Sequence, residues 1–132
     1  MLVPHLHFNG DCEKAITLYE KAFKTKADEI VRNHDYDSKK YAGDMQITHA
    51  SMTIHGQTVF LDDNKFFANK EKSSTFPVHL IIQFQTAEEL LSCYEVLKKE
   101  NETKHPFVKT PYSELVGNFA DKLNIWWGFM VI

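Results

Sequence analysis

Hydrophobic and polar residues alternate along several short segments of the chain, a spacing typical of β-strands that bury one face. The clearest example predicts a polar face with His49, Ser51 and Thr53 and an apolar face with Ala50, Met52 and Ile54. Strand-like segments span residues 2–8, 27–34, 45–54, 57–62, 78–85, about 107–110, 115–120 and 125–132. Turns are expected at Asn9-Gly10, at His55-Gly56 and at residues 121–124, because glycine and asparagine favour the backbone angles that tight turns need.

Two longer segments carry apolar residues three and four positions apart, which predicts amphipathic helices. One begins after Asp11 and ends near Phe23, and the other begins after Thr86 and ends at about Glu100, with Asp11 and Thr86 as N-caps. The helices are copies of one another, because GDCEKAITLYEKAF at residues 10–23 aligns with QTAEELLSCYEVLK at residues 85–98. The alignment shifts the numbering by 75, so that residue 10 falls on residue 85.

Each helix follows a strand, so the chain is predicted to repeat one βαβββ unit. The predicted fold class is α+β, with repeats at residues 1–63 and 77–132 that form one domain over residues 1–132. A solvated loop at residues 63–76 would join them. Each repeat is expected to form a curved four-stranded sheet with an apolar face under its helix, and the two sheets would enclose a cleft.

Composition narrows the classes of partner. The 132 residues are 43% hydrophobic, which suffices for one buried core. The net charge of -3 argues against nucleic acid, because phosphate binding needs a basic surface. No apolar run approaches the length of a membrane-spanning helix and no targeting motif opens the chain, so a cytoplasmic protein is expected. Cys12 and Cys93 are expected to be buried free thiols.

Three segments in this order and spacing resemble a known family: PHLHFNGDCEKAITLYEKAF at 4–23, ITHASMTIHGQTVFLDD at 47–63 and VGNFADKLNIWW at 116–127. Together with the duplicated unit they resemble the vicinal oxygen chelate superfamily, which includes glyoxalase I, extradiol dioxygenases and bleomycin or fosfomycin resistance proteins. The chain is most similar to the PhnB-like branch, which ends in FG-x-x-x-D-x-x-G-x-x-W. Gly117, Asp121 and Trp127 match that ending, while Asn124 stands where Gly is usual. An old methyltransferase label of this branch finds no support, because no glycine-rich turn follows a strand.

The resemblance implies a divalent ion bound by His, Gln or Glu side chains from the first and last strands of each unit. The shift of 75 pairs His79 on the first strand of the second unit with Pro4 on that of the first. Counting four residues from the turn residues Gly56 and Asn124 places the last-strand positions at Phe60 and Gly128. Only His79 is a metal ligand, so neither a complete metal site nor another cofactor is predicted. A slip of one residue in the first strand would instead turn His5 or His7 into the cleft. His79 and Asp62 could then join them as ligands, and this alternative stays open.

The expected wall of the cleft combines polar and aromatic side chains: His5, His7, His49, Phe60, Asp62, His79, Gln83 and Trp126. For His49 a cross-strand hydrogen bond is an equal alternative to ligand contact. Trp126 next to Gly128 would leave room for a planar ligand, and Trp127 would pack towards a helix. Asp62 and Asp63 end a strand, where carboxylates are expected to meet solvent.

Two functions follow from these residues. The first is a small-molecule-binding protein that lacks a complete metal site. The alternative is a divalent-metal-dependent enzyme, either a lyase, an isomerase, a dioxygenase or a protein of the drug-resistance type, with His79 and His5 or His7 as ligands. A homodimer is expected because exposed sheet edges favour pairing.

Overall fold

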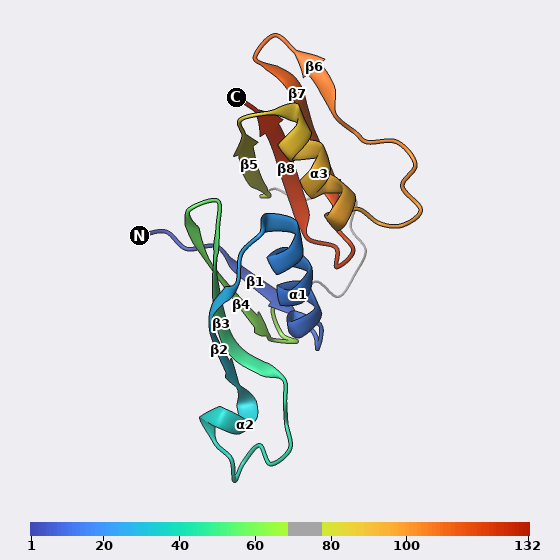
Figure 1. Cartoon of the computed structure of the whole chain (residues 1–132). Coiled ribbons are helices and arrows are strands. Elements are labelled where there is room, and N and C mark those ends of the chain that lie inside the picture. The colour runs from blue at the N-terminus through green and yellow to red at the C-terminus, as the bar shows by residue number, and fades with distance from the viewer. Residues whose placement is uncertain (69–77) are drawn as a thin grey trace. The chain divides into compact units, whose positions relative to one another are not determined.

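The computed structural model describes residues 1–68 and 78–132 (Figure 1). The chain divides into two compact units, Met1–Glu71 and Lys72–Ile132. Most of the predicted loop at residues 63–76, and Pro77, lie outside the described residues. Within the described residues, no helix is long and apolar enough to span a membrane.

The first unit contains four strands and two helices: β1 (His5–Phe8), α1 (Cys12–Phe23), β2 (Ala27–Arg32), α2 (Asn33–Tyr36), β3 (Ile47–Ile54) and β4 (Gln57–Asp63). Its sheet has the order β1-β4-β3-β2, with β1 parallel to β4 and the other pairs antiparallel. The helix α1 lies along one face of this sheet (Figure 1). Leu6, Phe8, Ala50, Met52 and Leu61 of the sheet are buried together with Ile16 and Tyr19 of α1.

The second unit repeats the plan with β5 (Leu80–Phe84), α3 (Ala87–Leu97), β6 (Val108–Thr110), β7 (Ser113–Ala120) and β8 (Trp126–Val131). Its sheet order is β5-β8-β7-β6, and β5 is parallel to β8. The predicted α+β class with two βαβββ units is therefore confirmed. The hairpin turn at His55-Gly56 is also confirmed, because both residues have the positive φ angles of 47° and 78° that a two-residue turn requires.

The two N-caps differ. The Thr86 hydroxyl accepts a hydrogen bond from the backbone N–H of Glu89 at 3.1 Å, as predicted. Asp11 stands at the N-cap position of α1, but its side chain makes no capping hydrogen bond. Its ψ of 9° is not extended, whereas a capping residue usually has an extended backbone.

Several element boundaries differ from the sequence prediction. Residues 2–4 precede β1, and β7 begins at Ser113 instead of Leu115. The second strand was expected to reach His34, but the chain turns into the short helix α2 at Asn33. Asp44 explains the change: its carbonyl accepts from the His34 N–H at 2.9 Å, and its carboxylate accepts from the Asn33 side chain at 3.1 Å.

Candidate functional site

The parallel pairing of β1 with β4 places His5 opposite Phe60 and His7 opposite Asp62. Side chains two residues apart in a strand point to the same face. Leu6, between the histidines, is buried on the α1 side, so both histidines lie on the face that α1 does not cover, which we call the open face. The alternative left open by the sequence is thereby answered for the first unit: His5 and His7 share a face with Phe60 and Asp62.

Asp62 holds the two histidines together. Its Oδ1 lies 2.7 Å from Nδ1 of His7 and its Oδ2 lies 3.3 Å from Nε2 of His5. Asp62 is only 8% exposed, and an ionised carboxylate can only accept hydrogen bonds, so His7 donates through Nδ1. The pKa of His5 lies below its ordinary value, chiefly because the ring is partly removed from water, although Asp62 opposes the shift. The lowered pKa favours the neutral form of the His5 ring, which is the form that binds a metal.

Aromatic rings surround this cluster. The Phe60 ring centroid lies 4.9 Å from that of His49 and 6.0 Å from that of His5. The Phe67 ring lies 5.1 Å from His7, although its side chain is otherwise exposed. Phe67 was not predicted as a site residue, because it lies in a loop segment without periodicity. His49 also approaches Glu29 across the sheet, at 4.0 Å between Nε2 and Oε2, so a cross-strand interaction is present.

The expectation that Asp62 and Asp63 both meet solvent is wrong. Asp62 is buried against the histidines, and Asp63 points to the other face of the sheet. The Asp63 carboxylate accepts hydrogen bonds from the backbone N–H groups of Gly10, Cys12 and Ile47 at 2.9–3.0 Å. It thus connects β4 to the start of α1 and the start of β3, and it replaces the cap that Asp11 does not supply.

The remaining predicted residues lie in the second unit. His79 precedes β5 and is exposed, and Gln83 on β5 is exposed, with Nε2 4.0 Å from Sδ of Met130. Trp126 begins β8 and is half-buried, whereas Trp127 is fully buried, as predicted. His5, His7, His49, Phe60 and Asp62 form their cluster within the first unit alone. A shared cleft that combines both sets of residues stays a prediction.

The strands do not follow the shift of 75 that relates the helices. His5 lies opposite Phe60, and Ile81 lies opposite Gly128, so β1 corresponds to β5 with a shift of 76, given that Phe60 corresponds to Gly128. The physical reason is the connection between strand and helix. Three residues separate β1 from α1, but only two separate β5 from α3. Matching Pro4 with His79 was therefore wrong, and His5 corresponds to Ile81.

One group of three metal-ligand side chains lies within residues 1–68 and 78–132. It consists of His5, His7 and Asp62, each with one ligand atom within 4.8 Å of the others. The positions assigned from the family fit a metal less well, because Phe60 and Gly128 supply no ligand atom. A Cβ on Gly128 would lie 2.9 Å from Oδ1 of Asn118 and 3.0 Å from Cγ1 of Ile81, so these exposed side chains would have to move to admit a longer one.

Cys12 and Cys93 are buried, as expected. Burial raises the pKa of the Cys12 thiol far above its ordinary value. Because the thiolate is the nucleophilic form, Cys12 is a core residue and not a reactive group.

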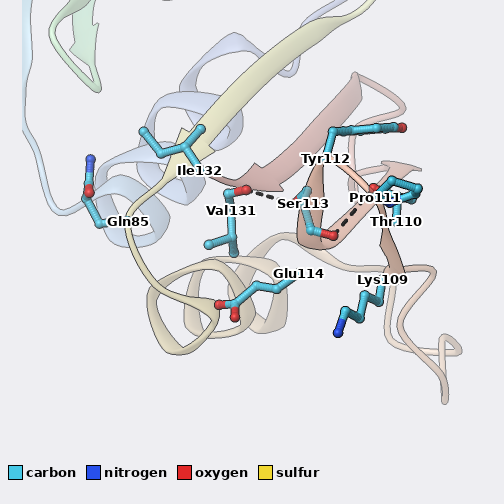
Figure 2. Close-up of a pocket in the computed structure, with 9 residues that line it drawn as sticks. All are labelled: Gln85, Lys109, Thr110, Pro111, Tyr112, Ser113, Glu114, Val131 and Ile132. Atoms are coloured by element: carbon cyan, nitrogen blue, oxygen red, sulfur yellow. Dashed lines mark hydrogen bonds between the residues drawn. The ribbon is translucent and has the colours of Figure 1, made fainter.

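The second unit has an open hollow of about 530 Å³ at one end of its sheet (Figure 2). Lys109, Tyr112 and Glu114 border it, and the buried Ser113 lies beneath. The Ser113 hydroxyl is already within 2.7 Å of the Val131 carbonyl and 2.9 Å of the Leu115 carbonyl. None of the candidate residues is among the described residues that line the hollow, and its buried polar group is satisfied.

The closing sequence motif has a structural role. The Asp121 carboxylate is fully buried and accepts from the backbone N–H groups of Leu123 and Ile125 and from Nε1 of Trp127, at 2.8–3.1 Å. Gly117 lies so close to Pro106 that a Cβ would be 2.8 Å from its carbonyl oxygen. Asn124 has a φ of 65°, which explains why glycine is usual at this position. These residues therefore shape the β7–β8 hairpin and do not supply chemistry.

Three solved structures have the same fold. A PhnB protein from Bacillus cereus aligns with a TM-score of 0.78 and 23% identity, covering 99% of this chain and 98% of that one. A glyoxylase/bleomycin resistance protein/dioxygenase domain from Frankia aligns with a TM-score of 0.68 and 18% identity, covering 99% of this chain and 90% of that one. The fosfomycin resistance protein FosX from Listeria monocytogenes, complexed with Mn(II) and sulfate, aligns with a TM-score of 0.63 and 12% identity. The alignment covers 100% of this chain and 91% of that one.

A search of curated proteins gives no match. A family profile described as 3-demethylubiquinone-9 3-methyltransferase matches residues 1–129. The chain therefore belongs to this family, and it shares the fold of the PhnB protein and of the glyoxylase/bleomycin resistance protein/dioxygenase domain.

Proposed function

We propose that this protein binds a small organic molecule on the open face of its first sheet. The observation that carries the proposal is the convergence of His5, His7 and Asp62 on that face, with Phe60 beside them. Binding sites typically combine a few convergent polar groups with aromatic walls. His49 belongs to the same face and extends this set of contacts within the first unit.

Methyl transfer, which the description of the family names, is not part of this proposal. Gly10 is the one glycine between β1 and α1, and none lies between β5 and α3. A nucleotide-like cofactor is usually held by a glycine-rich turn between a parallel strand and a helix.

Binding can be tested by titrating the ¹⁵N-labelled protein with a library of small organic fragments and following amide shifts. Fragments that bind should perturb residues 5–8 and 57–63. A His7→Ala variant should weaken fragment binding by about tenfold or more, since a hydrogen bond to a charged group contributes about 1.5–3 kcal/mol. His105→Gln, in an exposed loop, is the matched control. If no fragment perturbs these strands, or if all of them bind at the Lys109–Glu114 hollow, the proposal is wrong.

The second candidate is a divalent-metal-dependent lyase, isomerase or dioxygenase. It is supported by the grouping of three ligand atoms within 4.8 Å and by the similar fold of FosX, which was solved as a complex with Mn(II). A bound divalent ion would supply a Lewis acid that polarises a substrate oxygen. Turnover that survives thorough metal removal would contradict this candidate.

We also expect a homodimer. The edge strands β2 and β6 carry exposed apolar side chains, Ile30 at 40% and Val108 at 60% exposure. Edge strands with exposed apolar residues favour pairing with another chain. Light scattering at micromolar concentration should give twice the chain mass, and a monomeric mass would refute the dimer.

A further inference from the structure

The cluster of His5, His7 and Asp62 is built on two hydrogen-bonded strands, β1 and β4. The parallel register sets His7 beside Asp62, and the two-residue strand period sets His5 on the same face. Strand β4 lies between β1 and β3, so both of its edges are held by hydrogen-bonded neighbours. The three ligand groups therefore converge because of the sheet register and need no loop to bring them together.

The chemistry of the cluster suits a divalent transition-metal ion. Two imidazole nitrogens and one carboxylate oxygen are a common ligand set for zinc, iron, manganese or nickel. Ligand atoms around a tetrahedral ion lie about 3.4 Å apart when each bond is about 2.1 Å. The present atoms are within 4.8 Å of one another, so one ion between them would need the side chains to adjust, with His7 giving up its hydrogen bond to Asp62 or binding through Nε2. Three protein ligands would leave positions open for oxygen atoms of a small molecule.

In the corrected register the family positions are His5, Phe60, Ile81 and Gly128, and of these His5 alone offers a metal ligand. Phe60 has no ligand atom, and the space beside Gly128 is filled by Asn118, Ile81 and His79. Asp62 lies two residues further along β4 than Phe60, and His7 lies two residues further along β1 than His5. A cation site that uses these residues is displaced along the strands and is contained in one unit.

We propose that His5, His7 and Asp62 bind one divalent transition-metal ion, with all protein ligands supplied by the first unit. The biological purpose of the ion rests on the proposed small-molecule function. Ion binding itself is measured without any organic ligand, so failure of one proposal leaves the other standing.

The test uses full-length protein without a histidine tag, treated with a chelator and dialysed. Titration with Zn(II) by calorimetry should give one ion per chain, and Co(II) should develop the visible absorption bands of a nitrogen- and oxygen-bound site. His7→Gln and Asp62→Asn should each weaken binding by about tenfold or more, since even an outer partner of a metal ligand contributes this much. Circular dichroism of each variant checks that it is folded.

His105→Gln is the matched control, because it removes an exposed loop histidine, and His79→Gln tests whether the second unit supplies a ligand. Both should bind Zn(II) as the wild type does. Loss of binding in His79→Gln would overturn the one-unit site in favour of ligands from both units. Wild-type protein that binds no stoichiometric ion, or folded His7→Gln and Asp62→Asn variants that bind as the wild type does, would overturn the proposal outright.

Discussion

The buried carboxylate of Asp121 is the residue on which the β7–β8 hairpin depends. It is fully buried and accepts three hydrogen bonds, two from the turn backbone and one from Trp127. Asp121→Ala removes a buried acceptor of these hydrogen bonds, so we expect the free energy of unfolding to fall by about 3 kcal/mol. Urea denaturation measures the loss. Lys122→Ala, at an exposed neighbour in the same turn, should change stability by less than about 0.5 kcal/mol.

Gly117 gives a second prediction at the scale of one residue. A Cβ at this position would lie 2.8 Å from the Pro106 carbonyl oxygen and 3.1 Å from Cα of Phe107, both of which are backbone atoms that move only with the chain. Gly117→Ala should therefore lower the free energy of unfolding by about 1–3 kcal/mol. Asn118→Ala, on the exposed side of the same strand, is the control in the same urea experiment. Equal stability of the two variants would contradict the close approach seen here.

At the scale of elements, adjacent acids on β4 serve opposite faces and should respond differently to substitution. Asp63 accepts from Gly10, Cys12 and Ile47, so Asp63→Ala should lower the free energy of unfolding by about 2–4 kcal/mol. Asp62→Asn keeps its shape on the open face and should cost less than about 1 kcal/mol while impairing ion binding. Thermal unfolding of both variants separates the roles, and a larger loss in Asp62→Asn would reverse the assignment.

The elements themselves could be predicted because their signals are local. The alternation of hydrophobic and polar residues predicted the strands, and apolar residues three and four positions apart predicted both long helices. The pair His55-Gly56 predicted the tight turn. The short helix α2 has no periodicity of its own and depends on Asp44, eleven residues after Asn33 in the chain.

The candidate site was harder to predict because it depends on register. His7 and Asp62 are 55 residues apart, and only the parallel pairing of β1 with β4 brings them together. The connection between β1 and α1 is one residue longer than that between β5 and α3. The shift of 75 that aligns the two helices therefore does not align β1 with β5. A one-residue error of this kind exchanges the two faces of a strand, which is why Pro4 was assigned where His5 belongs.

At the scale of the whole molecule, each unit is small for an independent domain. Isolated units of about 60 residues bury a modest share of their surface and have marginal stability. The sequence predicted one domain over both repeats, and this prediction stays to be tested. It implies that the two units unfold together, in one cooperative transition.

The positions of the tryptophans make cooperative unfolding measurable. Both tryptophans, Trp126 and Trp127, are in the second unit, so their fluorescence reports its unfolding alone, whereas far-ultraviolet circular dichroism reports both units. Asp63→Ala weakens the first unit. We expect it to lower the midpoint of both signals equally, by roughly 10 °C for the stability loss predicted above. Lys21→Ala, on the exposed side of α1, should leave both midpoints unchanged. If the fluorescence midpoint stays at the wild-type value while circular dichroism shows an earlier step, the units unfold separately and the chain behaves as two domains.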